Sequence, residues 1–386
     1  MEWIVKRSSE LYVSSSGLSK ASDQFGYGFP FLSYKDVFNN YYAPEKLNTL
    51  VNSTEKDRQK CSVKRGDVFL TRTSETTDEL GMSCVALKDY ENATFNGFTK
   101  RLRPLTEEIV PEYAAYFFRS SYFRAQCQSL ASLITRASLN DGMIRRFKIR
   151  FPKEKKCQEK IGKILLTYDS LIENNTKRIR ILEKMAENLY KEWFVRFRFP
   201  GHEKVEMENG LPKGWKVKRY EDELNVKYGK GLPTNRLTEE GFPVFGSNGQ
   251  IGFYTSYMYE TPQILISCRG ASSGVVNISL PKSFVTNNSL VCELTDKTES
   301  VFEYLKYYFL NTNLVQYQTG SAQPQITINN VVKLKMLVPS HEVQCAFSKK
   351  IRVIDKEVAN LQNQNSLLTR QRDLLLPRLM SGKLEI

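Results

Sequence analysis

Residues that could catalyse a reaction are few in this 386-residue chain and do not stand at catalytic spacings. The segment GKGLP at Gly229 lacks the G-x-x-x-x-G-K-[ST] spacing of a phosphate-binding loop, and FGSNG at Phe245 lacks the context of a cofactor-binding glycine loop. NNYY at Asn39 has neither proline of the N/D-P-P-Y/F motif of amino-methyltransferases. Asp78 and Glu79 lie in an expected loop and are most simply solvated. We therefore predict a chain without a catalytic site of its own.

Metal-binding residues are equally sparse. His202 and His341 are the only histidines, which makes a zinc site improbable. No apolar run has the length of a transmembrane helix, and the N-terminal residues lack the apolar centre of a signal peptide. The cysteines are odd in number and never spaced as C-x-x-C, which predicts reduced thiols in a cytoplasmic protein. Together these features predict no bound metal and no membrane partner. The cysteines are Cys61, Cys84, Cys127, Cys157, Cys268, Cys292 and Cys345.

The charge of the chain indicates what it binds. Lys and Arg number 56 against 42 Asp and Glu, a formal net charge of +14. Such a surplus favours an acidic partner, and nucleic acid is the commonest one. A basic but otherwise ordinary soluble protein stays open on charge alone.

The segments that would position any site occur twice in the sequence. EWIVKRSSELYV at Glu2 returns as GWKVKRYEDELNV at Gly214, with a one-residue slip. EYAAYFF at Glu112 returns as EYLKYYF at Glu303, and FKIRFP at Phe147 parallels a later LKMLVP. Because the spacing between the copies shrinks along the chain, we expect two units with one frame and different contents.

Each copy ends in a long heptad pattern. Apolar residues recur at alternating steps of four and three, which keeps a seam on one side of a helix. This predicts two coiled-coil helices, over 158–197 and 343–376, ended by Pro200 and Gly201 and by Pro377 and Gly382. In an antiparallel pair, Asn175 and Asn365 either meet at one level or face solvent. The seam residues are Ile161, Leu165, Tyr168, Ile172, Asn175, Ile179, Leu182, Leu189, Phe347, Ile351, Ile354, Val358, Leu361, Asn365, Leu368 and Leu375.

Strand-like runs bounded by Gly, Asn, Ser and Pro fill the interior of each copy. The sequence thus predicts an α+β fold: two globular domains in a pseudo-twofold repeat, separated by two long helices that form an intramolecular antiparallel coiled coil. The expected parts are a first domain, a first helix, a linker, a second domain, and a second helix with its tail, at 1–152, 153–199, 200–213, 214–340 and 341–386.

Several segments resemble the specificity subunit of type I restriction-modification systems. They are FGSNGQIGFY (245–254), QPQITINNVVKLKMLVPS (323–340), ENLYKEWFVRFRFPG (187–201) leading into LPKGW, and the closing LLLPRLMSGKL (374–384). The likeness covers essentially the whole chain and is clearest in its second half. The first half departs from the family pattern at PKEKKCQEK (152–160).

The resemblance implies a non-catalytic subunit with two target-recognition domains. Each would read one part of a bipartite site in double-stranded DNA, and the helices would set the unread spacer. Two methyltransferase subunits would supply S-adenosylmethionine and methylate adenine, and restriction subunits driven by ATP with Mg²⁺ can join them. This chain would bind no cofactor.

Residues that could contact DNA follow from base chemistry. Arg pairs with guanine, and Asn or Gln pairs with adenine, through two hydrogen bonds to a base edge. For each candidate, a solvated loop residue is an equally open reading. The candidates, all expected in loops, are Arg72, Lys100, Arg101, Arg103 and Arg136 in the first domain, and Lys230, Asn248, Gln250, Arg269, Asn287, Asn288, Gln323 and Gln325 in the second.

Two other classes of function stay open. A coiled-coil scaffold with two protein-binding domains would show no affinity for duplex DNA. A stand-alone DNA-modifying enzyme with an unrecognised site would be active by itself. The missing motifs weigh against the enzyme, and the charge and the repeated frame weigh against the scaffold.

Overall fold

A computed structural model describes residues 2–76, 79–130, 132–133, 137–320 and 323–385. The chain divides into two compact units, each of which takes part of both long helices. Unit 1 comprises residues 1–176 and 363–386, and unit 2 comprises residues 177–362. The mixture of helix and sheet with two long helices confirms the predicted fold class. Within the described parts of the chain, no helix combines the length and apolar character needed to cross a membrane.

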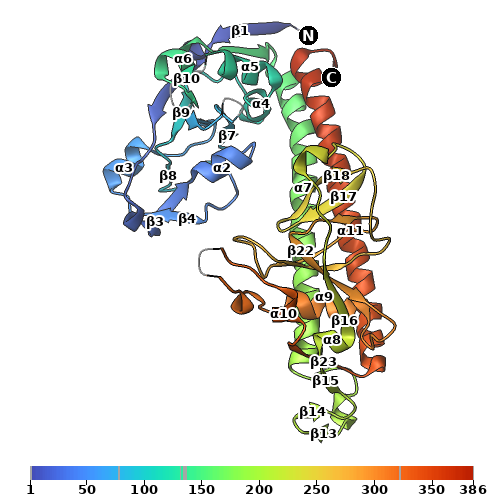
Figure 1. Cartoon of the computed structure of the whole chain (residues 1–386). Coiled ribbons are helices and arrows are strands. Elements are labelled where there is room, and N and C mark those ends of the chain that lie inside the picture. Colours follow the sequence, from blue (N-terminus) through green and yellow to red (C-terminus); the bar gives the residue numbers. More distant parts are fainter. Residues whose placement is uncertain (1, 77–78, 131, 134–136, 321–322, 386) are drawn as a thin grey trace. The chain divides into compact units, whose positions relative to one another are not determined.

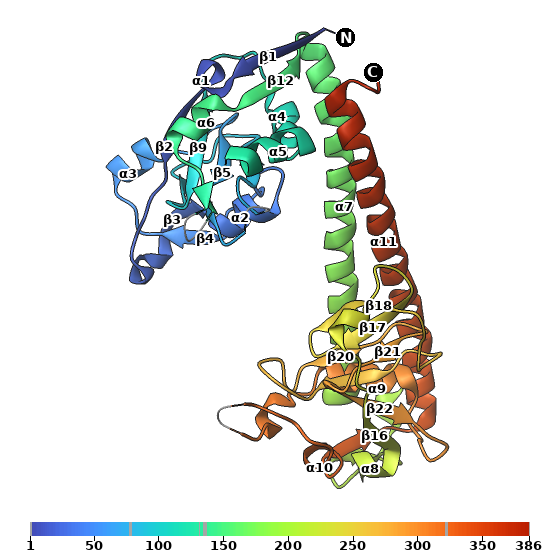
Figure 2. The ribbon, with the colours of Figure 1, turned by 45° about the horizontal axis from the view of Figure 1, so that its top comes forward.

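Unit 1 is built on a four-stranded sheet, in the order β2-β9-β5-β7, and a three-stranded sheet, β4-β3-β8. Helix α4 lies between the four-stranded sheet and α7 (Figure 2). The strands are β1 Trp3–Arg7, β2 Tyr12–Ser16, β3 Phe25–Leu32, β4 Thr49–Val51, β5 Val68–Thr71, β6 Thr73–Ser74, β7 Ser83–Val85, β8 Thr94–Phe95, β9 Thr99–Pro104, β10 Ser132–Leu133, β11 Ala137–Ser138 and β12 Lys148–Pro152. The short helices are α1 Ser8–Leu11, α2 Tyr34–Asn39, α3 Glu55–Lys60, α4 Pro111–Phe117, α5 Ser121–Leu130 and α6 Asp141–Arg146.

Unit 2 repeats this plan with a four-stranded sheet, β16-β22-β19-β20, and a three-stranded sheet, β18-β17-β21 (Figure 1). The strands are β13 Met207–Glu208, β14 Leu211–Pro212, β15 Lys216–Arg219, β16 Leu224–Tyr228, β17 Phe242–Gly246, β18 Gly249–Tyr254, β19 Ile264–Ser267, β20 Val276–Ile278, β21 Phe284–Val285, β22 Ser289–Leu294 and β23 Lys335–Val338. The short helices are α8 Tyr220–Glu223, α9 Phe302–Leu310 and α10 Ile328–Val331.

The likeness of the two copies extends into their interiors, further than the repeated edges of the sequence indicate. β1 pairs with β12 as β15 pairs with β23, and the parallel contact of β3 with β8 matches that of β17 with β21. Two glycines mark the same close approach of the backbone. A Cβ atom at Gly17 would lie 2.2 Å from the Asn96 carbonyl oxygen, and one at Gly229 would lie 2.3 Å from that of Thr286. The two units therefore share one backbone arrangement at positions where their side chains differ.

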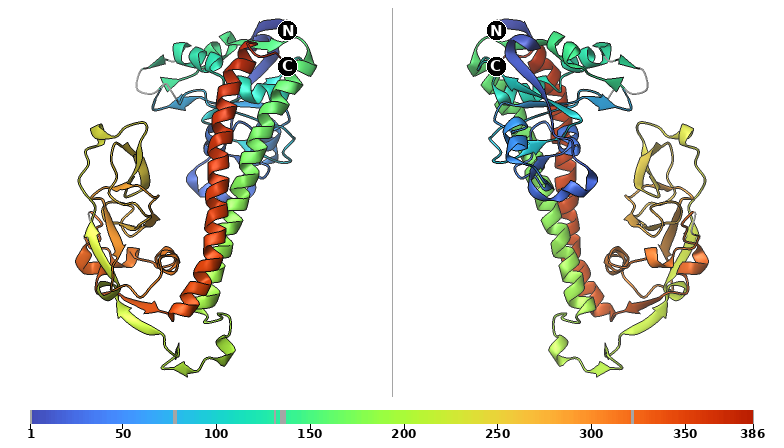
Figure 3. Two further views of the ribbon diagram at one scale, coloured as in Figure 1. Left: turned by 90° about the vertical axis from the view of Figure 1, so that its right-hand side faces the viewer. Right: turned by 90° about the vertical axis from the view of Figure 1, so that its left-hand side faces the viewer.

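The long helices are α7, Lys155–Tyr190, and α11, His341–Ser381, and they lie side by side (Figure 3). A π-helical turn, Lys191–Val195, ends the first. None of the predicted seam residues is exposed. Their pairing is antiparallel, because Asn175 contacts Gln364 while Asp169 contacts Arg372.

The expected stop at Pro377 is wrong, because α11 continues to Ser381. Proline removes one backbone hydrogen bond from a helix interior. Here that loss is offset by tertiary packing, since Leu376, Leu379 and Met380 are buried in the core of unit 1. Gly382, in the left-handed region at φ 74°, follows the helix end.

Identical side chains fasten each unit to the long helices. In unit 1 the buried Gln158 accepts a hydrogen bond from the Val110 N–H at 2.9 Å and donates to the Pro152 carbonyl at 2.8 Å. In unit 2 the buried Gln344 accepts from the Val301 N–H at 2.9 Å and donates to its own neighbouring proline at 2.8 Å. These two side-chain amides provide hydrogen-bond partners for buried backbone groups at the point where the last strand of each unit leads into its long helix.

Candidate nucleic-acid interface

The predicted site residues of unit 2 gather on Lys230 and on neighbouring segments, residues 246–250, 268–275, 286–288 and, among the described residues of the last segment, 319–320 and 323–325. Together we call these residues the loop face of unit 2. The Cys268 N–H donates to the Asn288 carbonyl at 2.9 Å, and the Asn287 N–H donates to the Lys230 carbonyl at 3.1 Å. Arg269 and Gln325 form an antiparallel bridge. The structure thus brings together candidates that lie far apart in the sequence.

Most of these side chains point into solvent. Asn287 is half-buried, whereas the other predicted residues of unit 2 are exposed: Lys230, Asn248, Gln250, Arg269, Asn288, Gln323 and Gln325. The Asn248 amide oxygen accepts from Ser272, and the Gln250 amide donates weakly to the Gly252 carbonyl at 3.5 Å. One guanidinium, one ammonium and several amides therefore share a surface, and this is the set of groups that reads base edges and phosphates.

Buried polar groups beneath the surface hold these loops in place. Ser267 is fully buried and donates to the Ser247 carbonyl. Asn277 donates to the same carbonyl at 3.4 Å, and the Cys268 thiol donates to the Asn287 carbonyl at 3.5 Å. Burial raises the pKa of Cys268, so the thiol stays protonated and can act as this donor. The exposed side chains are consequently carried on a pre-organised backbone.

Three of the predicted residues of unit 1 have structural partners instead. Lys100 is buried, and its ammonium lies 2.9 Å from the Asp141 carboxylate and 2.9 Å from the Ser16 hydroxyl. The Arg103 guanidinium donates two hydrogen bonds to the carboxylate of the buried Asp67, at 2.7 and 2.6 Å. Each ion pair has one buried partner, Lys100 in the first and Asp67 in the second, so breaking the pair to reach a base would leave a buried charge without its partner.

Arg101 is enclosed as well. Its guanidinium donates to the Ser62 carbonyl at 2.7 Å and lies 5.4 Å from the centroid of the Phe95 ring. Burial, together with the nearby charge of Arg103, lowers the pKa of Arg101. The sequence suggested a solvated basic loop, but these residues belong to strand β9, whose first four positions are buried. Their geometry weighs against direct contact with bases.

Two predictions for unit 1 remain. Arg72 is half-buried after β5, and its backbone N–H donates to the Phe98 carbonyl at 3.0 Å. Arg136 lies outside the described residues. Sequence reasoning missed Phe98, which is 61% exposed on the turn before β9. Aligning FNGFT (95–99) with VTNNS (285–289) would have found it, because the two turns occupy the same place in the frame.

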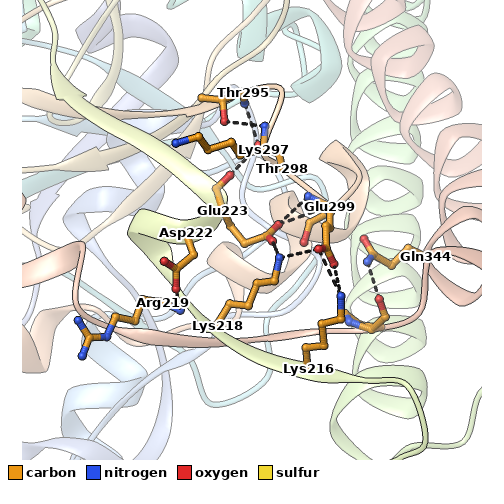
Figure 4. Close-up of polar contacts among 12 residues, drawn as sticks. Lys216, Lys218, Arg219, Asp222, Glu223, Thr295, Lys297, Thr298, Glu299 and Gln344 are labelled. Atoms are coloured by element: carbon orange, nitrogen blue, oxygen red, sulfur yellow. Dashed lines mark hydrogen bonds and ion pairs between the residues drawn. The ribbon is translucent and has the colours of Figure 1, made fainter.

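A cluster of charges in unit 2 could be mistaken for a catalytic centre (Figure 4). The buried Glu223 carboxylate accepts from Lys218 at 2.7 Å and from the Glu299 backbone N–H at 3.0 Å. Hydrogen bonds from Lys218 and Lys216 lower the pKa of Glu299, so it is an ionised carboxylate near neutral pH and a poor general acid. The cluster joins α8 to the start of α9. Across the described residues, no group of three or more His, Cys, Asp and Glu is placed to hold a metal ion.

A family model described as the type I restriction modification DNA specificity domain matches residues 2–184 and 212–370. The type I restriction enzyme MjaIX specificity subunit of Methanocaldococcus jannaschii is 26% identical, over 100% of this chain and 94% of that protein. The HindI specificity subunit of Haemophilus influenzae is 22% identical, over 92% and 94%. The crystal structure of the type I restriction-modification S subunit from M. genitalium shares the fold, with a TM-score of 0.61 at 17% identity over 98% of this chain and 96% of that one.

Proposed function

The chain belongs to the type I restriction-modification DNA specificity domain family, and from this premise we propose that each unit reads one half of a split site in double-stranded DNA. The observation that carries the proposal is the pair of matching frames with unlike exposed residues. The same turn presents Phe98 in unit 1 and Asn288 in unit 2. One backbone design would thus display two different sets of reading groups.

The proposal includes partner subunits that perform the chemistry. Methyltransferase subunits, two for the two units, would bind this chain and supply S-adenosylmethionine for adenine methylation. Restriction subunits would bring ATP and Mg²⁺, and the chain itself would bind no cofactor.

Exposed apolar residues on both long helices support docking of another protein. In unit 1 they are Leu171, Leu367 and Leu374. In unit 2 they are Ile181, Met185 and Val353.

The test maps methylation in cells that express this chain with the methyltransferase subunits of its system. One split motif with a constant gap is the expected result, and Arg269→Ala should relax that motif in one half only. Discrimination at the affected base pair should fall by about 1–3 kcal/mol, the contribution of a bidentate contact. A stable complex without any methylated motif would favour the scaffold reading. Methylation by the isolated chain would favour the enzyme.

Two lysines serve as matched controls for charge. Lys230 lies on the loop face, whereas Lys282 is an exposed lysine beside Glu260 at 3.6 Å. The N–H of Ser279, three residues before Lys282, donates to the Gln263 carbonyl beside the start of β19. Arg269 follows the end of that strand, so Lys282 and Arg269 lie toward opposite ends of it. Lys230→Ala should weaken binding to all sequences alike and reduce the salt slope by about one unit, and Lys282→Ala should change neither quantity. Equal effects of both variants would contradict the placement of DNA on the loop face.

A further inference from the structure

Phe98 is an aromatic side chain that unit 1 leaves in water without a structural need. It is 61% exposed, while Phe95 and Phe69 nearby are completely buried. Burying a phenylalanine side chain stabilises a protein by about 1.5–3 kcal/mol, so an exposed one on a tight turn gives up that gain. Such a residue is a candidate for contact with a ligand.

The turn that carries Phe98 is rigid. The Phe98 N–H donates to the Asn96 side chain at 2.7 Å, and the Phe98 carbonyl accepts from the Arg72 N–H at 3.0 Å. The Gly97 N–H donates to the Leu18 carbonyl at 2.9 Å. Both backbone polar groups of Phe98 are therefore bound, and its ring is presented on a fixed platform.

The same hydrogen bonds recur in unit 2 and define the equivalent residue. The Asn287 N–H donates to Lys230 as Gly97 donates to Leu18, and the Asn288 carbonyl accepts from Cys268 as Phe98 accepts from Arg72. Phe98 of unit 1 is therefore structurally equivalent to Asn288 of unit 2. One unit places an apolar ring at this point of the frame, and the other places an amide.

The groups around Phe98 show what could lie against it. A recess of about 360 Å³ adjoins the ring and is lined by Tyr34, Thr73, Ser74, Glu75 and Glu79. Carboxylates repel phosphates but accept hydrogen bonds from exocyclic amino groups of bases. In the major groove an A·T pair offers such an amino group on adenine and an apolar methyl group on thymine. A ring beside acceptors complements that edge.

We propose that Phe98 reads the methyl group of one thymine in the half-site bound by unit 1, and that Asn288 reads an adenine at the equivalent point of the other half-site. The inference rests on the proposed function and adds the bases that the two units distinguish. Because the two positions are equivalent in the frame, a base edge that meets Asn288 in one half-site corresponds to a base edge beside Phe98 in the other. Insertion of the ring between base pairs is the competing outcome.

The experiment measures binding of the complete methyltransferase complex to duplexes that carry the mapped split site. Each thymine is replaced in turn by deoxyuridine, which lacks only the methyl group. The wild-type complex should lose about fourfold in affinity at one thymine, the contribution of roughly one buried methyl group. The same complex must prefer the mapped site to a scrambled one, and failure there would refute the proposed function itself.

Phe98→Ala should bind the thymine duplex about as weakly as the wild type binds the deoxyuridine duplex, and it should no longer distinguish the two. Leu105→Ala is the control, since Leu105 is 59% exposed at the opposite end of β9 and should keep the distinction. Phe98→Asn places on this turn the amide that unit 2 carries at position 288, and it should shift the preference on that strand from thymine to adenine.

Several results would overturn the inference. A half-site without any A·T pair, a flat deoxyuridine series in the wild type, or a Phe98→Ala complex that still senses the methyl group would each do so. A uniform loss of affinity in Phe98→Ala, together with increased fluorescence of 2-aminopurine beside the site in the wild-type complex only, would identify an inserted ring instead.

Discussion

The two units hold the long helices with the same pair of residues but with different cations. In unit 1, Tyr116 donates to Asp169 at 2.5 Å, and Arg372 of α11 pairs with that carboxylate at 2.5 Å. In unit 2, Tyr307 donates to Asp355 at 3.0 Å, and the cation is Lys306, at 2.7 Å on α9. A tyrosine hydrogen bond needs a fixed geometry, whereas charge attraction depends mainly on distance. The repeat therefore fixed the tyrosine and aspartate and left the source of the positive charge free.

The largest expected difference between the units comes from removing the two aspartates. The Asp169 and Arg372 side chains are only 10% and 13% exposed, so Asp169→Asn leaves a nearly buried guanidinium with the half-exposed Asp373 carboxylate, 2.8 Å away, as its remaining partner. We expect a loss of about 3 kcal/mol in the free energy of unfolding. Asp355→Asn should lose about 1 kcal/mol, because its ion pair is partly solvated. Denaturant titration measures both, and equal losses would show that the source of the cation is unimportant.

The buried glutamines should behave alike where the aspartates differ. Gln158→Leu and Gln344→Leu each leave buried backbone groups without partners, at a cost of about 2 kcal/mol. Gln158 also donates to the Glu108 carbonyl at 2.9 Å, so its loss should be the larger by a few tenths. Thermal unfolding of the two variants checks this. A neutral effect in one unit only would mean that the frames are not equivalent in energy.

A smaller contrast is expected where α7 and α11 touch the short helices α4 and α9. A Cβ atom at Gly162 would lie 2.8 Å from that of Glu112, whereas the matching Ser348 donates to Glu303 at 2.7 Å. Gly162→Ala should lose about 1–2 kcal/mol by overpacking, and Ser348→Ala about 1 kcal/mol by losing a hydrogen bond. Denaturant midpoints distinguish them. A stabilised Gly162→Ala would show that the backbones can separate without cost.

The smallest effect is a dependence on pH in unit 2. Burial would raise the pKa of Glu303, but hydrogen bonds from Arg352 and Ser348 outweigh it and hold the pKa below its ordinary value of 4.5. A carboxyl group whose pKa is lowered by folding contributes stability above its unfolded pKa and loses it as the pH falls through the folded one. Stability should therefore drop below about pH 4.5, and the drop should be shallower in Glu303→Gln. Parallel curves for variant and wild type would remove Glu303 from this role.

The polar layer in the seam shows how far sequence reasoning could reach. Asn175 and Asn365 do lie at one level, but they do not bind each other. Asn175 donates to Gln364 at 3.4 Å, and Asn365 donates to Thr176 at 3.3 Å. The heptad spacing placed both amides in the seam, since period alone decides which face of a helix is buried. Their partners depend on the rotation and stagger of two helices, which period does not specify.

The sequence by itself determined the two helices, the repeated frame and the family, because helical period and repeated segments are local properties of the chain. Only the tertiary structure decided which basic residues are free. The sequence offers Lys100 and Arg103 as candidate DNA contacts, and in the structure they are bound by Asp141 and Asp67, which lie 41 and 36 residues away. Ion pairs between distant residues form only when the sheet brings them together. The same folding left Arg269, Asn288 and Phe98 exposed on rigid turns, where no structural partner competes for them.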